Sequence, residues 1–489
     1  MVAFILPANS ATGGYEISNS LRMGPSGGDT TPHVNLRRTL GSAGTEEKFT
    51  YSCWVKISAK LEYNFWLLGG SQEASSPNQT TFFRISSDGK LRLSDGSVNL
   101  NTNRLFRDPS AWYHIVLAVD STQGTDSNRV KIYVNGVQET SFANETYPSQ
   151  NLAFRVLENG VTQTIGTWIA DDGTAYACDD GYISEVYLID GAQKAPTDFG
   201  ETNDNGVWIP KDYSGTYGTH GFRFEFKQTG SSANSSGIGA DTSGNDNHFS
   251  VNNSAATDIT TDTPQNNFCT INSVFSDAGT NTVAADYSEG NTKLLKTVDA
   301  WGHGRGTFLL SSGKWYAEAK VTETGTGEAG QFGIVPSVLS GTTDANDKIE
   351  GLRVNMGGSS TIFQKMDTGT GSNVFTDFAS EDIVMLAIDL DNNKLWVGND
   401  GTWYNNNNAS TTLSPSNHDV TLPSNDVGWI FTIGGYTDGG NNLAWEFNWG
   451  NPSFSISSSN ADANGYGNME FAVPSGFYTC CTKNLAEYG

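Results

Sequence analysis

Positive charge is scarce in this chain. Its 489 residues hold 28 Lys and Arg against 53 Asp and Glu, which gives a net charge of −25. A surface that binds nucleic acid takes much of its affinity from Lys and Arg beside the phosphates. The balance therefore argues against nucleic acid as a partner.

Long apolar runs and cysteines are scarce as well. No stretch approaches the roughly 18 consecutive apolar residues of a membrane helix, so we expect no membrane span. Residues 2–6 are apolar but lack the basic start of a secretory signal, and we expect a short strand or a docking arm there. The five cysteines contain no pair or Cys/His cluster with zinc spacing. So sparse a set favours a chain that folds in a reducing cytosol.

Helical periodicity is missing, and strand periodicity takes its place. Residues 49–57 alternate between apolar and polar, and residues 130–134 do so before Asn135-Gly136, a dipeptide typical of tight hairpins. Residues 112–119 form a continuous apolar run that suits a central strand covered on both faces. With 11% aromatic residues the chain can bury a core, which excludes the disordered class.

A second strand-rich block begins near residue 301. It contains strand-like segments at 314–321 and 383–390, and the latter turns back through 391–393 into 394–397. Short strands separated by Gly, Asn and Asp turns are typical of β-sandwiches. We therefore predict an all-β chain with two antiparallel β-sandwiches.

The stretch between the two blocks is rich in Ser, Asn, Thr, Asp and Gly, which is the composition of a loop. We expect it to be an extended linker that wraps along one or both sandwiches. The predicted parts are a docking arm at 1–17, a first sandwich at 18–227, the linker at 228–300, a second sandwich at 301–475 and a tail at 476–489.

Several strand motifs resemble known modules. Residues 49–55, 112–116 and 130–136, with a closing strand at 180–191, resemble a laminin-G-like, concanavalin A-like domain. The second block resembles a SPRY domain. Its matching motifs are the opening Gly-Lys-aromatic-Tyr-x-Glu at 313–318 and the central hairpin at 387–391 and 395–397.

The connectors resemble those of bacteriophage virion proteins that pair these two modules. Residues 206–211, 239–245 and 476–485 are similar to segments of that family, and residues 262–269 resemble its Asp-Thr-Pro-x-Asn-Asn-Phe signature. The resemblance implies a structural or adhesion protein of the virion, made in the host cytoplasm, such as a fibre, a capsid decoration or a tail-associated protein. It also implies attachment to other virion proteins, for which we expect the N-terminal arm, and contact with a host surface glycan or another virion protein. It leaves a homo-oligomer open.

The residues that glycan hydrolysis needs are not evident. Concanavalin A-like hydrolases carry a Glu-x-Asp-x-x-Glu strand, whereas no Glu here is followed two residues later by Asp. The six histidines lie far apart, and neither a nucleophile elbow nor a P-loop is present. We therefore expect no enzyme. The alternative is a secreted glycan-active enzyme or bacterial adhesin with the same fold.

Acidic loops offer oxygen ligands that calcium prefers. They lie at 241–246, 344–347 and 389–393, but none completes an EF-hand, and solvated turns explain them equally well. We expect no cofactor, and calcium stays open without an assigned site.

Carbohydrate binding needs aromatic rings beside polar groups that orient hydroxyls. Trp403 and Tyr404 in the loop 401–408, and Tyr436 beside the loop 434–442, are the candidates. The alternative is that Trp403 closes a hairpin core and Tyr436 begins a strand. Because like charges raise the cost of approach, we expect a neutral or zwitterionic polysaccharide that contacts the second sandwich.

Overall fold

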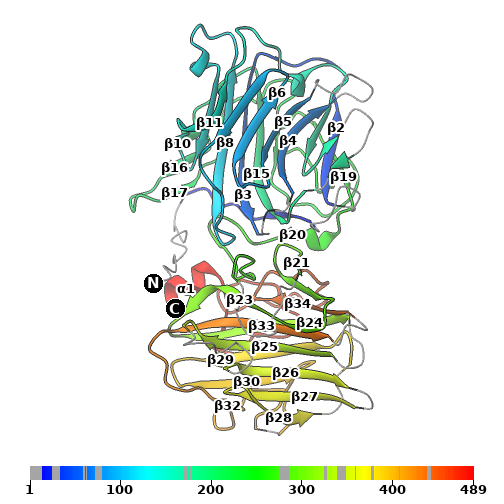
Figure 1. The fold of residues 1–489 in the computed structure, drawn as a ribbon, viewed down its shortest axis with the longest axis vertical. Helices are drawn as coiled ribbons and strands as arrows, with labels where there is room; N and C mark the ends of the chain where they lie inside the picture. The colour runs from blue at the N-terminus through cyan, green and yellow to red at the C-terminus, as the bar shows by residue number, and fades with distance from the viewer. Residues whose placement is uncertain are drawn as a thin grey trace. The chain divides into compact units, whose positions relative to one another are not determined.

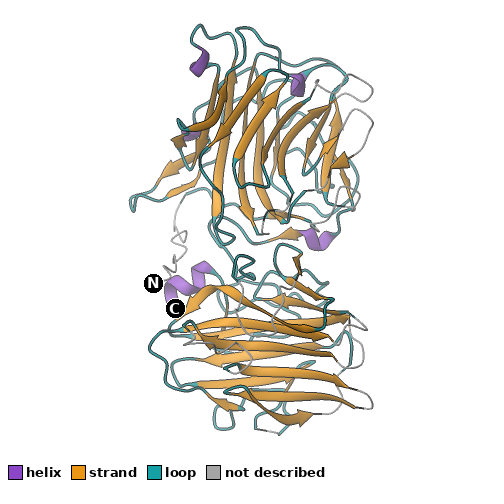
Figure 2. Ribbon diagram, viewed as in Figure 1, coloured by secondary structure: helices purple, strands orange, loops and turns teal. Residues whose placement is uncertain are grey.

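The fold is almost entirely β, as predicted. In this computed structural model the described residues are 14–24, 33–58, 61, 63–71, 80–169, 175–176, 178–275, 286–323, 328–338, 348–357, 360–375, 379–406, 408–437 and 442–489. Within them the helical segments are four short 3-10 turns and one α-helix, α1 (Thr482–Tyr488). Figure 2 shows that strands and loops make up the rest. The chain divides into two compact units with a boundary between residues 265 and 266.

The first unit is built from two eight-stranded antiparallel sheets, and Figure 1 labels several of their strands. We name them the β3 sheet and the β5 sheet. The β3 sheet has the order β10 (Val137–Gln138), β9 (Val130–Val134), β8 (Trp112–Asp120), β3 (Lys48–Ile57), β15 (Gly181–Asp190), β1 (Ser20–Met23) and β20 (Ile259–Thr260), with β18 (Phe222–Phe224) paired to β15. The β5 sheet has the order β11 (Phe142–Thr146), β7 (Val98–Thr102), β6 (Leu91–Asp95), β5 (Thr81–Ile85), β4 (Phe65–Ser71), β12 (Thr162–Ile165), β2 (Asn35–Thr39) and β19 (Ser250–Asn252).

Two sequence signals of the first unit are confirmed. The apolar run 112–119 forms β8, a central strand between β3 and β9. Asn135 and Gly136 join β9 to β10 with φ values of +48° and +78°, the conformation that two-residue hairpin turns require. The apolar side chains of both sheets meet in one core, to which β3 contributes Phe49 and β5 contributes Phe83.

The second unit has the same construction, with a nine-stranded β24 sheet and a six-stranded β25 sheet. The β24 sheet has the order β21 (Asp286–Ser288), β22 (Lys293–Lys296), β34 (Leu443–Asn448), β24 (Lys314–Glu323), β29 (Ile383–Asp389), β30 (Lys394–Asn399) and β31 (Thr402–Trp403), with β32 (Val420–Thr421) beside β30 and β35 (Tyr478–Thr479) parallel to β24. The β25 sheet has the order β23 (Ala300–Leu310), β33 (Trp429–Thr437), β25 (Glu328–Pro336), β26 (Glu350–Gly357), β27 (Ser360–Asp367) and β28 (Thr370–Phe375). Trp315 and Leu386 from the first of these sheets share a buried core with Phe332 and Ile433 from the second.

The predicted linker 228–300 is divided between the units instead of forming a separate segment. Strand β19 pairs with β2 and β20 pairs with β1, so residues up to 265 complete the first unit. Strands β21 and β22 extend the β24 sheet of the second unit. A polar composition predicts a loop, but it does not show whether the backbone pairs with the edge of a sheet. For this reason the sequence predicts a linker at 228–300, whereas the structure has a single boundary between residues 265 and 266.

The unit boundary falls inside the signature at 262–269. Asp262 is buried in the first unit, where its carboxylate accepts hydrogen bonds from Lys56 Nζ at 2.8 Å and Trp112 Nε1 at 2.9 Å. The backbone N–H of Asn267 donates to Thr482 Oγ1 at 3.0 Å in the second unit. The predicted tail also belongs to the second unit, through β35 and α1. Each half of the signature therefore has a packing role in its own unit.

The predicted docking arm falls largely outside the described residues, which begin at residue 14. Its last residues lie on the first unit, where Ile17 packs with Trp54 and Tyr182. Attachment through the arm at 1–17 stays a prediction. Among the described residues, no helix is both long and apolar enough to cross a membrane.

Candidate functional site

Trp403 and Tyr404 are core residues in this structure. Their exposed fractions are 4% and 2%, and Trp403 pairs with Gly398 across β30 and β31 while its ring contacts Tyr316. This is the alternative arrangement, in which Trp403 closes a hairpin core. It corrects the expectation that the two rings form an open platform, because neither presents a face to solvent.

Tyr436 is half-buried on β33 and lies among other aromatic and polar side chains of the β25 sheet. Its ring is 5.6 Å from that of Trp301, which stacks on His303, and the Arg353 guanidinium lies 5.0 Å from the Trp301 ring. The alternation Trp301-Gly302-His303-Gly304 carries a signal for this face, because it sets bulky side chains on one side and glycines on the other. This second aromatic face contains Tyr436 without Trp403 or Tyr404.

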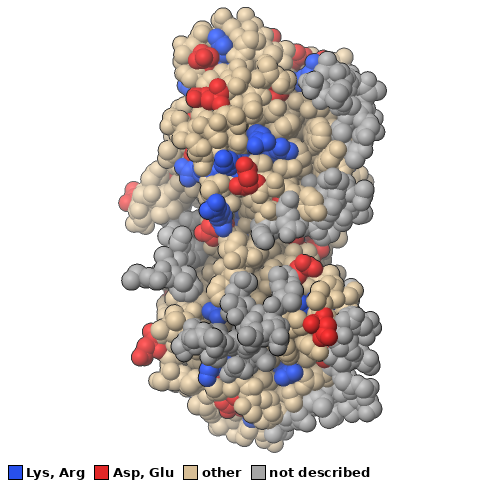
Figure 3. Space-filling model, in the orientation of Figure 1, with Lys and Arg blue, Asp and Glu red and all other residues tan. Residues whose placement is uncertain are grey.

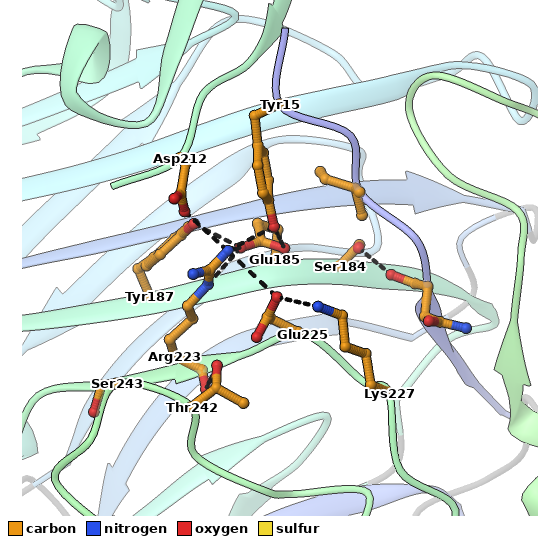
Figure 4. Close-up of polar contacts among 12 residues, drawn as sticks. Tyr15, Ser184, Glu185, Tyr187, Asp212, Arg223, Glu225, Lys227, Thr242 and Ser243 are labelled. Atoms are coloured by element: carbon orange, nitrogen blue, oxygen red, sulfur yellow. Dashed lines mark hydrogen bonds and ion pairs between the residues drawn. The ribbon is translucent and has the colours of Figure 1, made fainter. Parts of the chain in front are cut away.

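A buried polar cluster lies on the β3 sheet (Figure 4). Glu185 sits at a β-bulge of β15 with a left-handed φ of +48°, an unusual conformation for a residue with a side chain. Its carboxylate accepts hydrogen bonds from Tyr15 Oη at 3.0 Å, Tyr187 Oη at 2.6 Å and Arg223 Nε at 2.7 Å. Burial raises the pKa of Glu185, and the positive charge of Arg223 opposes that rise.

The Glu185 cluster uses its polar groups internally. Arg223 also contacts Asp212 at 3.1 Å and Glu225 at 3.5 Å, so its charge is more than balanced. Burial raises the pKa of Tyr15 and of Tyr187, and the negative charge of Glu185 adds to both shifts, so the hydroxyls stay protonated as donors. This arrangement holds the segment around Tyr15 on the sheet, which is a structural role.

The outward face of the β5 sheet differs, because several of its buried polar atoms have no hydrogen-bond partner among the described residues. Phe83, Leu93 and Leu100 point into the core, so the residues that alternate with them point outward. The register places Trp66 opposite Arg84, Arg84 opposite Arg92, and Arg92 opposite Asn101. We call these four residues the arginine row.

Aromatic rings stand at one end of the arginine row. Trp66 stacks on Trp168 with ring centroids 5.8 Å apart, and Trp168 contacts Tyr176 at 4.9 Å. Phe82 meets Trp66 edge to face at 5.8 Å. Trp168 and Tyr176 come from β13 (Trp168–Ile169) and β14 (Ala175–Tyr176), a small hairpin. Phe82, Trp168 and Tyr176 are half-buried, so part of each ring is accessible.

Four buried polar atoms, three in the row and one on the neighbouring Trp168, have no hydrogen-bond partner among the described residues. These buried atoms are Arg84 Nε, Arg92 Nε, Asn101 Oδ1 and Trp168 Nε1. Buried polar groups in folded proteins are almost always paired, so each such atom requires an explanation. Three donors and one acceptor beside aromatic rings can together hold a polar ligand that has an apolar face.

The positive charges of Arg84 and Arg92 repel each other. Burial, and after it the positive charge of Arg92, lower the pKa of Arg84 to about 10, while the negative charge of Asp88 opposes the shift. Sequence reasoning missed this row because its four residues come from four separate strands, β4 to β7, and the neighbouring Trp168 comes from β13 much later in the chain. The alternation Phe82-Phe83-Arg84 within β5 gives no functional signal alone.

The described residues form no metal-binding site. Within the described ranges, no group of three or more His, Cys, Asp and Glu side chains is placed to hold a metal ion. In the loop 241–246, Asp241 accepts hydrogen bonds from the backbone of Arg223, Ser243 and Asn247. Asp389 accepts from Asn392 and pairs with Lys314. The loop 344–347 lies outside the described residues, and calcium binding stays untested.

Comparisons with known proteins identify the domain that carries the arginine row. Residues 27–197 match the family model described as the concanavalin A-like lectin/glucanases superfamily. A comparison with curated proteins finds no match.

Solved structures with similar folds include laminin, pentraxin and SPRY domains. Domains LG4-5 of the mouse laminin alpha1 chain share 10% identity, covering 96% of this chain and 88% of that chain, with a TM-score of 0.27. The heptameric SAP-like pentraxin from Limulus polyphemus shares 18% identity over 37% of this chain and 80% of its own, with a TM-score of 0.27. The SPRY domain of human HERC1 shares 12% identity over 33% of this chain and 91% of its own, with a TM-score of 0.23. The match to the concanavalin A-like family model, at residues 27–197, falls within the first unit.

Proposed function

We propose that the protein binds carbohydrate through the outward face of the β5 sheet and leaves it chemically unchanged. The observation that carries this proposal is the arginine row itself, with buried donors and an acceptor that have no partner among the described residues and lie beside half-buried aromatic rings. Aromatic faces accept the apolar side of a sugar ring, and fixed polar groups orient its hydroxyls. The family model supports the proposal, because its description includes lectins.

Binding without reaction fits the chemistry of this face. Glycoside hydrolysis uses two carboxyl groups on either side of the scissile bond, about 5–5.5 Å apart in retaining enzymes and wider in inverting ones. The arginine row and its aromatic rings contribute no Asp or Glu side chain. The buried carboxylate of Glu185 lies on the other sheet and is enclosed by its own partners.

A glycan array with the full chain tests the proposal. Trp168→Ala should reduce binding at least tenfold, because it removes a stacking ring and a donor. The matched control is Trp301→Ala, which removes a half-buried tryptophan from the second aromatic face. Loss of binding in Trp301→Ala alone would move the site to the second unit, and steady release of reducing ends by the wild type would favour the glycan-active enzyme.

We propose further that the chain is a structural or adhesion protein of a bacteriophage virion. The support for this proposal is the sequence resemblance at residues 262–269. Deletion of residues 1–13 should leave both units folded, while the shortened chain should no longer join particles. Mass spectrometry of purified particles, with electron cryomicroscopy to locate the chain, checks both statements. Normal incorporation of the shortened chain would place the attachment elsewhere.

A further inference from the structure

We infer that the arginine row recognises an acidic sugar, whose anionic group lies between Arg84 and Arg92. This inference deepens the proposed function and depends on it. It concerns a negatively charged group, either the carboxylate of a sugar acid or a sulfate ester, because both accept hydrogen bonds from guanidinium groups in the same way.

The first argument is the pairing of like charges. Arg84 and Arg92 lie directly opposite each other on neighbouring strands, and their side chains share the outward face. Side chains in such positions have Cβ atoms about 4.5–5.5 Å apart, and like charges there destabilise a sheet. Two arginines at this position therefore cost stability unless an anion lies between them.

The second argument is the lack of a protein anion. Among the described residues, neither Arg84 nor Arg92 forms a hydrogen bond or an ion pair, although acidic residues outnumber basic ones in the chain. Other arginines do pair. Arg155 meets Glu158 at 2.7 Å, and Arg223 meets Glu185 at 2.7 Å. Asp88, in the turn between β5 and β6, acts on both arginines through its charge, and its carboxylate accepts a hydrogen bond from Ser86 Oγ at 2.6 Å.

The third argument is the fixed position of one guanidinium. The Cζ atom of Arg84 lies 4.7 Å from the ring centroid of Trp66 and 4.6 Å from that of Phe82. These cation–π contacts hold the planar group in place, so less side-chain entropy is lost when an anion binds. A guanidinium group held in this way can donate two parallel N–H hydrogen bonds to one carboxylate or sulfate.

The neighbouring groups suit the rest of a sugar. Asn101 is 4% exposed, and its unpaired Oδ1 can accept a hydrogen bond from a hydroxyl. The indole N–H of Trp168 can donate one, and the accessible part of its ring can stack on the sugar. The ligand class is thus a ring with one anionic group and free hydroxyls.

The expectation of a neutral or zwitterionic polysaccharide rests on the net charge of the whole chain, whereas this inference rests on the local charge at the arginine row. Figure 3 shows acidic and basic side chains scattered among uncharged residues on the face in view, without one continuous acidic surface. Exposed charges farther away than about 8–10 Å are largely screened at physiological salt, so the arginines dominate the local field.

The test is an array of sialylated, uronate-containing and sulfated oligosaccharides, each printed beside its neutral counterpart. The full chain is compared with Arg92→Gln and with Arg107→Gln, which removes an equal charge from an exposed arginine. We expect the wild type and Arg107→Gln to bind acidic members at least tenfold more strongly than neutral ones, and Arg92→Gln to lose that preference. Arg92→Lys, which keeps the charge without the fork, should retain part of it.

Each outcome decides something. A preference for the carboxylate or the sulfate arm identifies the anion. Equal binding to acidic and neutral members, or an unchanged preference in Arg92→Gln, overturns the inference and leaves carbohydrate binding standing. No binding to any member, acidic or neutral, overturns the proposed function as well. Near-ultraviolet circular dichroism of each variant confirms that the fold is intact before its binding is compared.

Discussion

Glu185 shows how one strained residue can be held in place. A left-handed φ costs a residue with a side chain roughly 1–2 kcal/mol, and here hydrogen bonds from Tyr15, Tyr187 and Arg223 offset that cost. Glu185→Gln would leave Arg223 without its buried charge partner, although Asp212 and Glu225 remain nearby. We expect the first unit to lose about 2 kcal/mol of unfolding free energy, measured by urea denaturation. Glu201→Gln, at an exposed site, is the control, and an equal small loss in both variants would contradict this account.

Glu350 makes the stability of the second unit depend on pH. Burial raises its pKa to about 7, while hydrogen bonds from Thr368 oppose the shift. Because the folded-state pKa lies above the ordinary value, the stabilising contribution is complete below about pH 4.5 and is lost as pH rises through 7. Glu350→Gln should therefore stabilise the second unit at pH 8 relative to the wild type, by on the order of 2–3 kcal/mol, and change little at pH 4.5. Urea denaturation at both pH values measures this difference, and an equal effect at the two would refute the assignment.

Strand β23 depends on its glycines. A Cβ added at Gly304 would lie 2.8 Å from Tyr287 Oη and 3.0 Å from Ile271 Cγ2, both within the second unit. Gly304→Ala should therefore lower the stability of that unit by about 1–3 kcal/mol, as overpacking does. Gly124→Ala is the matched control, because a Cβ there meets no atom within 4 Å. Differential scanning calorimetry gives both melting temperatures, and similar values for the two variants would show that β23 can accommodate the methyl group.

The elements differ in how well the sequence predicts them. β8 and the β9–β10 hairpin follow from local signals, because burial on both faces and a positive-φ turn each restrict residue choice. β19, β20 and β22 are only two to four residues long, and pairing with strands distant in the sequence makes them β. The arginine row was also unpredictable from local sequence, because only the register between separate strands brings Trp66, Arg84 and Arg92 together. Trp403 shows the converse error, in which a polar loop composition conceals a core residue.

At the scale of the whole molecule, each unit has its own two-sheet core. We expect a fragment of residues 14–265 and a fragment of residues 266–489 each to unfold cooperatively. Their near-ultraviolet circular dichroism spectra should add up to that of the full chain. A fragment that stays molten or aggregates under conditions in which the full chain is folded would contradict the boundary at 265/266.

The central claim is that the sugar lies on the β5 sheet of the first unit and not beside Tyr436 in the second. Hydroxyl-radical footprinting of the full chain, with and without the strongest ligand from the array, tests it most directly. Mass spectrometry then reads the oxidation of each aromatic residue. We predict that the ligand lowers oxidation at Phe82, Trp168 and Tyr176 and leaves Trp301 and Tyr436 unchanged. Protection of Trp301 and Tyr436 without protection of Trp168 would contradict the account.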